Sequence, residues 1–271
     1  MNNSTPAKEA VREFWQERSR GELYAQGKSL RQRVEAQARA RYELEPFIHR
    51  FARFEEGCGR DVLEIGVGMG ADYLEWARHS PRQLVGIDVT EQAVEFTRQR
   101  LELYGFRSDL RVGDAEGLPL PDSSFDIVYS WGVLHHSPDT PLAVREVHRV
   151  LRPGGVARIM IYHHPSVVGT LLWARYGALQ RRSFAEVYAN YLESLGTKAY
   201  TVQEVTELFR EFADVHIAIE LSAGDLLTGA AGRRYGGVLL TTALKLWPRW
   251  LIRALLPRYG SFMLIEATRH P

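Results

Sequence analysis

The sequence predicts an α/β fold built on a doubly wound, mostly parallel sheet of seven strands. Three observations lead to this prediction. Short apolar runs alternate with segments of helical periodicity, glycines or capping residues separate them, and the composition of the 271 residues (45% hydrophobic, 25% charged) is that of a globular protein. Strands that alternate with helices of this length pair in parallel, because each helix returns the chain to the same end of the sheet.

The expected elements follow the chain in order. VREFWQERS and residues 30–54 carry apolar side chains at helical spacing, so the first sixty residues are expected to be helical. The seven expected strands are DVLEI, QLVGID, DLRVGD, FDIVYS, VARIMIYH, DVHIAIEL and SFMLIEATR.

Helix signals lie between these strands. Thr90 is expected to cap the helix EQAVEFTRQRLELYG, and Thr140 with the following proline is expected to start the helix PLAVREVHRVLR, which the Pro-Gly-Gly from residue 153 ends. Thr201 and Glu204 form a capping box ahead of the helix TVQEVTELFREF. These signals support the alternation of strands and helices.

Charge and cysteine content exclude several classes of protein. The formal net charge is only +1, so the chain as a whole lacks the charge of a polyanion binder. A lone cysteine, Cys58, excludes an internal disulfide framework and a multi-cysteine metal site. The start MNNSTPAKEA lacks a signal-peptide pattern, and no apolar run approaches the ~18 residues of a spanning helix. We therefore expect a soluble, cytoplasmic protein without a nucleic-acid partner.

A glycine turn follows the first expected strand. Gly66, Gly68 and Gly70 stand at alternate positions before a helix, where bare backbone N–H groups can hold an anionic or polar group. Gly66-x-Gly68-x-x-Ala71 also fits the dinucleotide fingerprint, with Asp88 near the expected ribose-binding acid. The turn alone therefore leaves a nucleotide-dependent oxidoreductase open.

Further motifs surround this turn. They are ExGxGxG (residues 64–70), GID (86–88), GDAEGLPLPDSSFDIV from residue 113 and HRVLRPGG from residue 148. Together they resemble the class I S-adenosyl-L-methionine (SAM)-dependent methyltransferases, in the small-molecule branch of ubiquinone/menaquinone-methyltransferase-like enzymes. The resemblance covers residues 60–163 strongly and the later strands weakly, and it implies a Rossmann-like methyltransferase sheet with SAM as cofactor and S-adenosyl-L-homocysteine as product.

The resemblance also implies which residues bind SAM. It places the methionine part of SAM against the glycines, the ribose hydroxyls on Asp88, the adenine amine on Asp114 and the adenine ring beside Ala115. The full set of cofactor-binding residues that it implies is Glu64, Gly66, Gly68, Met69, Asp88, Val89, Asp114, Ala115 and Ser130.

Histidines follow two strands whose carboxyl ends are expected to be neighbours. They are the pairs His135-His136 and His163-His164. Methyl transfer needs a base only when the acceptor must lose a proton, so His135, His136 and His163 are the candidates for such a base or for pocket lining. Adjacent side chains point apart, so we expect one histidine of each pair to face the pocket. No ligand spacing predicts a metal site.

Two segments, roughly residues 165–198 and 224–259, interrupt the alternation. Residues 166–183 and 226–259 contain no Asp or Glu but are rich in Leu, Trp, Tyr and Arg. We expect them, with the N-terminal helices, to form a lid over the acceptor. KLWPRWLIRALLPRYG also suits contact with an anionic membrane surface; a homodimer interface or internal packing stays open.

The expected organisation has six segments. They are an N-terminal helical lid (1–58), a SAM-binding core (59–164), a cap insertion (165–200), a core helix and strand (201–223), a basic apolar insertion (224–259) and the last core strand (260–271). The favoured function is a SAM-dependent methyltransferase for a small or lipid-like acceptor, methylated on O, N, S or C, at the inner membrane face or free in the cytoplasm. The alternatives are the oxidoreductase and a non-catalytic SAM- or S-adenosyl-L-homocysteine-binding module.

Overall fold

A single seven-stranded sheet organises the chain. The computed structural model describes residues 6–17, 24–194, 196–228 and 247–271. The sheet has the order β3-β2-β1-β4-β5-β7-β6, and every neighbouring pair is parallel except those made by β7. The strands are β1 (Asp61–Ile65), β2 (Gln83–Asp88), β3 (Asp109–Val112), β4 (Phe125–Trp131), β5 (Leu151–Tyr162), β6 (Phe212–Glu220) and β7 (Phe262–Arg269). The predicted mostly parallel, doubly wound sheet is confirmed.

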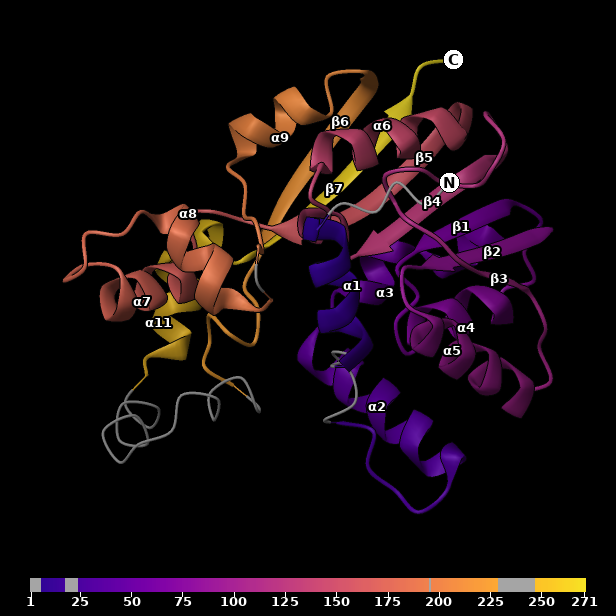
Figure 1. Ribbon diagram of the computed structural model, residues 1–271, viewed down its shortest axis with the longest axis horizontal. Coiled ribbons are helices and arrows are strands. Elements are labelled where there is room, and N and C mark those ends of the chain that lie inside the picture. The colour runs from indigo at the N-terminus through magenta and orange to yellow at the C-terminus, as the bar shows by residue number, and fades with distance from the viewer. Residues whose placement is uncertain (1–5, 18–23, 195, 229–246) are drawn as a thin grey trace.

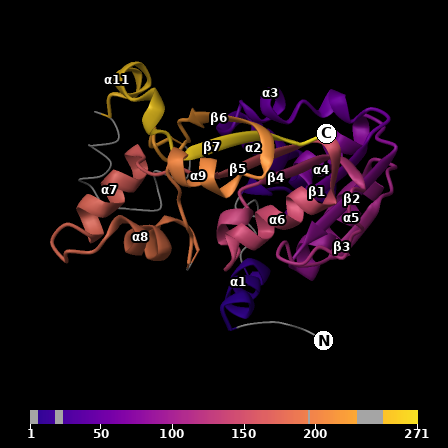
Figure 2. The ribbon, with the colours of Figure 1, turned by 90° about the horizontal axis from the view of Figure 1, so that it is seen from above.

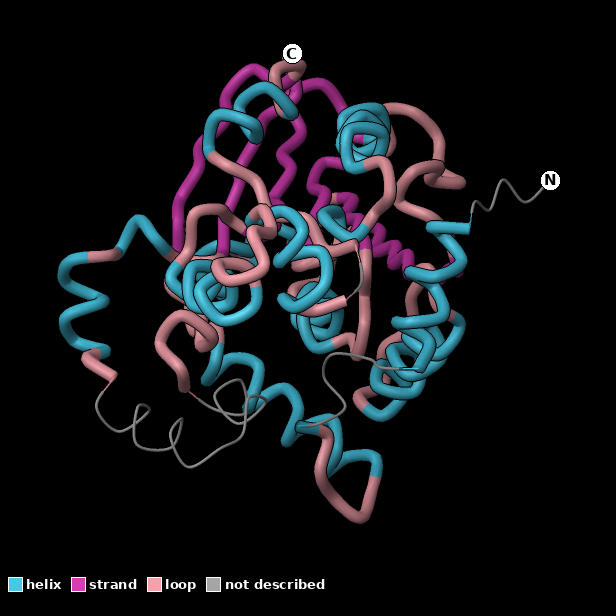
Figure 3. The backbone as a smooth tube through the Cα atoms, turned by 60° about the vertical axis from the view of Figure 1, so that its left-hand side comes forward, coloured by secondary structure: helices cyan, strands magenta, loops and turns pink. Residues whose placement is uncertain are grey.

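Helices lie around this sheet (Figures 1 and 3). The described helices are α1 (Pro6–Glu17), α2 (Leu30–Leu44), α3 (Ile48–Ala52), α4 (Ala71–Arg78), α5 (Glu91–Leu103), α6 (Thr140–Val150), α7 (Val167–Tyr176), α8 (Phe184–Val187), α9 (Val202–Leu208) and α11 (Arg249–Leu255). Short turns of helix lie at η3 (Leu134–His136) and η4 (Tyr188–Leu192).

The alternation of side chains along β1 shows how the sheet is buried on both faces. Leu63 and Ile65 join a core cluster that includes α6 and α9, whereas Val62 joins a second cluster that includes α3 and α4. Successive strand residues point to opposite faces, so one short apolar run serves both clusters. Glu64 lies on the same face as Val62, at the carboxyl end of the strand.

Three details differ from the expected elements. The N-terminal helix ends at Leu44, and α3 starts beyond Pro46, because proline cannot continue the helical hydrogen bonds. The cap of α6 is Asp139, whose side chain accepts from the Leu142 N–H at 2.9 Å; the predicted cap at Thr140 is wrong, because that hydroxyl donates to the Leu134 carbonyl. β5 starts at Leu151, which pairs with Phe125 ahead of a bulge.

The late insertions form a lobe beside the sheet. We call residues 165–194 with 224–228 and 247–259 the cap lobe; it contains α7, α8 and α11, and it lies apart from α4 and α5 in both Figure 1 and Figure 2. Residues 229–246, which include Arg233, Arg234 and Lys245 of the basic insertion, lie outside the described residues. Among the helices that the structure describes, none has the length and apolar content needed to cross a bilayer.

A buried carboxylate attaches the cap lobe to the sheet. Asp225 is fully buried, and its Oδ2 accepts hydrogen bonds from the backbone N–H groups of Ser222 and Ser261, both at 2.8 Å. Its Oδ1 accepts from the Val168 N–H at 2.9 Å. One side chain thereby joins the first turn of α7, the turn after β6 and the start of β7.

Candidate active site

A cavity of about 720 Å³ opens at the carboxyl ends of β1, β2 and β4. Its lining comes from the glycine turn, from the ends of these strands, from the N-terminal segment and from the cap lobe. In open α/β sheets ligands bind at this edge, where neighbouring crossover connections leave a crevice. The position of the cavity therefore follows from the topology of the sheet.

The glycine turn supplies bare backbone to one side of this cavity. Gly66, Gly68 and Gly70 have φ of 81°, 51° and 70°, a region that favours glycine. A Cβ on Gly66 would lie 2.1 Å from a Val133 methyl carbon, whereas a Cβ on Gly68 would meet nothing within 4 Å. Close packing thus requires glycine at residue 66, while at residue 68 the backbone faces open space.

Asp88, at the end of β2, lines the cavity beside the glycine turn. Its Oδ2 accepts from the Gly68 N–H at 3.0 Å, and its Oδ1 accepts from the Thr90 N–H at 3.0 Å and the Thr90 hydroxyl at 2.9 Å. Burial raises the pKa of Asp88, although these donors oppose the rise. The carboxylate is thereby fixed at the edge of the cavity, with lone pairs left for ligand hydroxyls.

Glu64 is the buried acid of the site. Its side chain is 3% exposed and lines the cavity, and its Oε2 has no hydrogen-bond partner among the described residues. Burial raises the pKa of Glu64 well above its usual range, and the Asp72 carboxylate raises it further. A cationic ligand group would supply the missing partner and favour the ionised form.

An ion pair beside Glu64 joins the N-terminal segment to the core. Arg41 of α2 donates through Nε to Asp72 Oδ1 at 2.8 Å, and the Tyr129 hydroxyl donates to Asp72 Oδ2 at 2.7 Å. Burial opposes ionisation of Asp72, but the Arg41 guanidinium lowers the pKa of that carboxyl. No local pattern in the sequence links α2 to α4, so this pair could not be predicted from it.

Asp114 follows β3 and also lines the cavity, next to Ala115. Its Oδ1 accepts from the Glu116 N–H at 2.9 Å, and its Oδ2 accepts from Lys8 of α1 at 2.5 Å. Lys8 also pairs with Glu116 at 2.7 Å. The first helix is therefore fastened to the loop after β3 by one ammonium group.

The other residues implied to bind the cofactor divide into two groups. Met69 and Val89 line the cavity. Ser130 is fully buried and is absent from the lining; its hydroxyl donates to the Ile65 carbonyl at 3.0 Å and so joins β4 to β1.

The histidine candidates lie in different places. His136 lines the cavity, while His135 is fully buried behind it with its ring 4.2 Å from that of His136. His163 is absent from the lining, and its Nδ1 is 2.8 Å from the Gly260 carbonyl. Burial lowers the pKa of His163.

Glu193 and Tyr162 also line the cavity, and neither was predicted as a site residue. Glu193 Oε2 lies 3.4 Å from His136 Nε2 and accepts from the Tyr162 hydroxyl at 2.5 Å. His135, His136 and Glu193 have ligand atoms within 4.8 Å of one another. Glu193 belongs to a segment without periodicity, so its approach to η3 had no signal in the sequence.

The cavity has an apolar end beyond these polar groups. Phe14, Trp15 and Tyr24 line it from the N-terminal segment, and Val168, Leu192 and Leu227 line it from the cap lobe. Trp173 and Tyr176 are absent from the lining; they stack within the lobe, on Phe184 at 5.0 Å and on Tyr191 at 4.3 Å between ring centroids.

Comparisons with known proteins identify a methyltransferase domain in the chain. Residues 63–159 match the family model described as a methyltransferase domain. A relative from Mycobacterium ulcerans, a probable phthiotriol/phenolphthiotriol dimycocerosates methyltransferase 2, is 40% identical over 40% of this chain and 41% of its own length. Methyltransferase GfsG from Streptomyces halstedii is 28% identical over 79% of this chain and 76% of its own length.

A solved structure agrees with the fold over a larger part of the chain. The SAM-dependent methyltransferase from Mesorhizobium loti superposes with a TM-score of 0.55 at 22% identity, over 79% of this chain and 93% of that protein. By contrast, the match to the Mycobacterium ulcerans relative spans about two fifths of that protein.

The donor set fits the chemistry of SAM. Glu64 presents a buried carboxylate oxygen that no described residue pairs with, which suits the cofactor's amino group, and Asp88 presents acceptors suited to ribose hydroxyls. Gly68 leaves open space beside its backbone. Residues 63–159 therefore form a methyltransferase domain, the sheet has the fold of the solved methyltransferase, and the donor set beside these residues fits SAM as the cofactor.

Proposed function

We propose that the protein transfers a methyl group from SAM to a small or lipid-like acceptor of largely apolar character. The observation that carries this proposal is that one cavity has two chemically different ends. Glu64, Gly68 and Asp88 line the polar end, and the aromatic and aliphatic side chains of the N-terminal segment and cap lobe line the other. Such a chamber suits a charged cofactor facing an apolar acceptor.

The relatives give this proposal further support. The Mycobacterium ulcerans relative is described as a probable methyltransferase of phthiotriol/phenolphthiotriol dimycocerosates. Its resemblance is confined to about two fifths of each chain, so it supports the class of acceptor rather than its identity. The apolar end of the cavity supports the same class independently.

The residues of the chain have mainly to orient the reactants and exclude water. When bound, SAM supplies a methyl group already activated on a sulfonium, so placing the two reactants in line provides most of the rate. Asp88 and Glu64 fix one reactant at the strand ends, while Phe14 and Trp15 of α1 line the apolar end of the cavity. Lys8 holds α1 in this position through Asp114 and Glu116.

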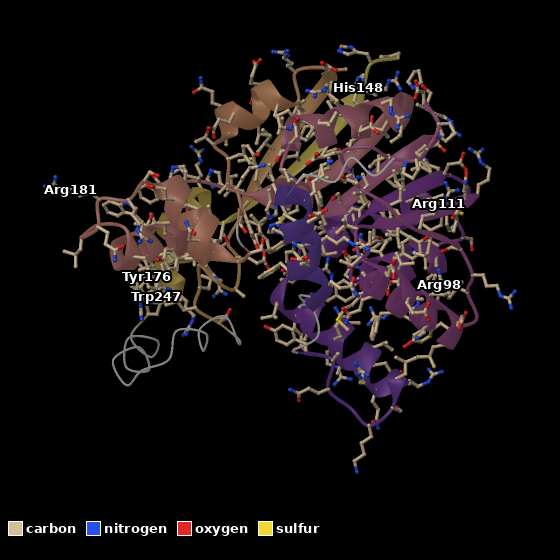
Figure 4. All side chains as sticks on the ribbon, viewed as in Figure 1. Arg98, Arg111, His148, Tyr176, Arg181 and Trp247 are labelled. Atoms are coloured by element: carbon tan, nitrogen blue, oxygen red, sulfur yellow. The ribbon has the colours of Figure 1, made fainter. Side chains whose placement is uncertain are left out.

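The outer surface of the cap lobe supports a membrane-facing role. Six of the eight exposed large hydrophobic residues found in the described ranges belong to this lobe: Leu171, Leu179, Trp250, Leu255, Leu256 and Tyr259. Residues 226–259 carry only basic charges, and Arg181 extends away from the lobe (Figure 4). Exposed apolar side chains among arginines suit an anionic lipid surface, and we infer that acceptors reach the cavity from there.

The first experiment is transfer of a labelled methyl group from SAM into an extract of the source cells, partitioned between organic and aqueous phases. Label in the organic phase supports a lipid-like acceptor. Label confined to the aqueous phase would redirect the search to soluble metabolites. Absence of both transfer and SAM binding by calorimetry would refute the proposed function.

A second experiment addresses the membrane surface. The wild-type protein is expected to co-sediment with vesicles that contain anionic lipid, and the double variant Arg249→Glu/Arg253→Glu is expected to remain in solution. The matched control is Arg98→Glu/Arg111→Glu, on the far side of the molecule (Figure 4). Wild-type protein that never sediments would remove the membrane from the proposal.

A further inference from the structure

Two histidines and a carboxylate of the cap lobe meet beside the cavity. His135 and His136 form part of η3, the turn after β4, and Glu193 directly follows η4. One potential ligand atom of each lies within 4.8 Å of the other two, and no other described group of three such side chains is close enough to hold a metal ion. The side chains of His136 and Glu193 are 4% and 7% exposed, and His135 is fully buried.

The separation of two of these atoms already suits a zinc ion. His136 Nε2 is 3.4 Å from Glu193 Oε2. Two ligands of a tetrahedral zinc ion, each bound at about 2.0–2.2 Å, lie about 3.3–3.6 Å apart. The third atom, a ring nitrogen of His135, has to approach by at most about 1.5 Å to reach this spacing, a shift within the range of a ring rotation.

The hydrogen bonds around His136 place its hydrogen on Nδ1. The Ser194 hydroxyl is 3.0 Å from His136 Nδ1 and 3.1 Å from the Thr197 hydroxyl, and Thr197 donates its own hydrogen to the Ser194 carbonyl at 2.7 Å. Ser194 can therefore donate to Thr197 and accept from an Nδ1–H. The opposite tautomer would bury an Nε2–H that forms no hydrogen bond with any described residue. Nε2 thus presents a lone pair.

This lone pair faces a carboxylate oxygen. Two acceptor atoms 3.4 Å apart repel each other unless a cation lies between them. A proton on Nε2 does not join them, because the approach of His136 to Glu193 lacks the geometry of a hydrogen bond. A metal ion bound to both atoms does join them, and it also satisfies the buried nitrogen.

The groups around these ligands resemble the outer shell of a metal site. A ligating histidine usually donates its second ring nitrogen to a fixed acceptor, and Ser194 has that place beside His136. The Tyr162 hydroxyl donates to Glu193 Oε2 at 2.5 Å, and a carboxylate oxygen has a further lone pair for an ion. The Trp15 ring packs against His136 at 5.0 Å between centroids and restricts its rotation.

The cavity gives an ion a route to this cluster. His136 and Glu193 both line it, and three protein ligands leave the fourth position of a tetrahedral ion to a water molecule from the cavity. The Lys198 ammonium does not fill the gap between the ligands. It donates to the Ser137 carbonyl at 2.6 Å and the Pro138 carbonyl at 2.8 Å, and so fixes the chain after the two histidines.

We propose that His135, His136 and Glu193 bind one divalent metal ion of the zinc type, which joins the cap lobe to the turn after β4. Imidazole nitrogens with one carboxylate are a donor set that Zn²⁺ accepts, whereas Mg²⁺ and Ca²⁺ prefer oxygen ligands. Local ligand spacing could not predict this site, because its carboxylate comes from a distant segment of the chain. The inference does not depend on the proposed methyl transfer.

Calorimetric titration of the full chain, freed of metal with EDTA and dialysed, tests the site. One Zn²⁺ per chain is expected to bind, and Mg²⁺ is not. His136→Asn and Glu193→Gln each remove a ligand and should weaken zinc binding by more than about 100-fold, whereas Ser194→Ala removes only an outer-shell partner and should weaken it by about 10–100-fold. His148→Asn, remote on α6 (Figure 4), is the matched control and should bind zinc as the wild type does.

Thermal unfolding separates lost ligation from lost folding. At free zinc about 100 times the Kd, the wild-type Tm should rise by about 5–10 °C. Each ligand variant should keep a cooperative transition in EDTA but show no rise with zinc. Protein labelled with ¹⁵N-histidine should show the His136 Nε2 resonance shifting on zinc addition while Nδ1 keeps its hydrogen.

Three results would overturn the proposal. They are a wild-type chain that binds no zinc, ligand variants that bind it as tightly as the wild type, and a zinc-induced shift confined to other histidines. Hydrogen exchange in α8 and η4 should also slow when zinc binds, because the ion holds the cap lobe against η3. Loss of SAM binding with zinc binding intact would instead refute the proposed function and leave this site standing.

Discussion

The two ends of the cavity are built in different ways. The cofactor end comes from one stretch of chain, residues 64–115, whose side chains are aligned by the parallel register of β1, β2 and β3. The acceptor end joins α1 to the cap lobe, far apart in the sequence, and its parts are attached by single polar side chains such as Lys8 and Asp225. The chain therefore fixes its cofactor site by backbone pairing between strands and its acceptor site by individual side-chain contacts.

The largest expected effect tests the independence of the two ends. Asp225→Ala leaves the N–H groups of Val168, Ser222 and Ser261 buried without their acceptor, which costs the cap lobe about 3 kcal/mol or more. Hydrogen exchange in α7 and α11 should rise strongly while calorimetry finds unchanged SAM affinity. Asp214→Ala, exposed on β6, is the matched control. Loss of SAM binding in Asp225→Ala would show that the two ends are not independent.

Two glycine variants separate packing from ligand contact at the cofactor end. Gly66→Ala forces a Cβ against Val133 at positive φ and should cost about 2–4 kcal/mol of stability. Gly68→Ala should cost only the backbone strain, about 1–2 kcal/mol, but should weaken SAM binding, since residue 68 faces the cavity.

Denaturant unfolding and calorimetry measure both quantities. Gly154→Ala carries a similar strain, because that residue has a φ of 75° and open space around it near the start of β5, away from the cavity. It should leave SAM affinity unchanged. Equal loss of SAM binding in Gly68→Ala and Gly154→Ala would assign the effect to folding rather than to ligand contact.

Glu64→Gln should separate stability from function. Burial raises the folded-state pKa of Glu64, so the wild-type carboxyl stabilises the ligand-free fold only at low pH and loses that contribution as pH rises from about 4.3 through the folded pKa. The glutamine variant avoids this loss, and its advantage in Tm should be larger at pH 8 than at pH 5. Its SAM affinity should fall by about 10–100-fold, as expected for a lost charged hydrogen bond. A variant less stable than wild type at pH 8 would contradict this account.

Lys8→Ala should have the smallest effect. Its ion pairs with Asp114 and Glu116 are partly exposed, and such pairs contribute about 0.5–1 kcal/mol. The acceptor KM should rise by about 2–5-fold, and added salt should reduce the difference from wild type. Arg12→Ala serves as the control. Arg12 lies on the same helix as Lys8, and this change removes an exposed ion pair with Glu91 of α5. A large loss of SAM affinity would place Lys8 at the cofactor end instead.

The cofactor end could be predicted largely from the sequence. The glycines at 66–70, the acid at the end of β2 and the alternation of strands and helices are local patterns, and the parallel sheet is confirmed. Ser130 shows the limit of such patterns, because its strand was located but the direction of its hydroxyl, toward the Ile65 carbonyl, depends on how β4 pairs with β1.

The acceptor end could not be predicted to the same degree. The histidine pair at 135–136 was identified, yet which member lines the cavity depends on the turn at η3. Glu193 and Ser194 meet His136 only because the cap lobe docks against that turn, and Lys8 reaches Asp114 across 106 residues of chain. These contacts have no counterpart in the spacing of neighbouring residues.

The sequence by itself determined the strands, the helix caps at Thr90 and Thr201 and the backbone freedom of the glycine turn, because each depends on residues a few positions apart. The tertiary structure decided the burial of Glu64 and the partners of Asp72, His136 and Asp225, because those depend on which faces pack together. Side-chain periodicity specifies which face of an element is buried, whereas the position of one element along another is set by packing and polar pairing over the whole domain.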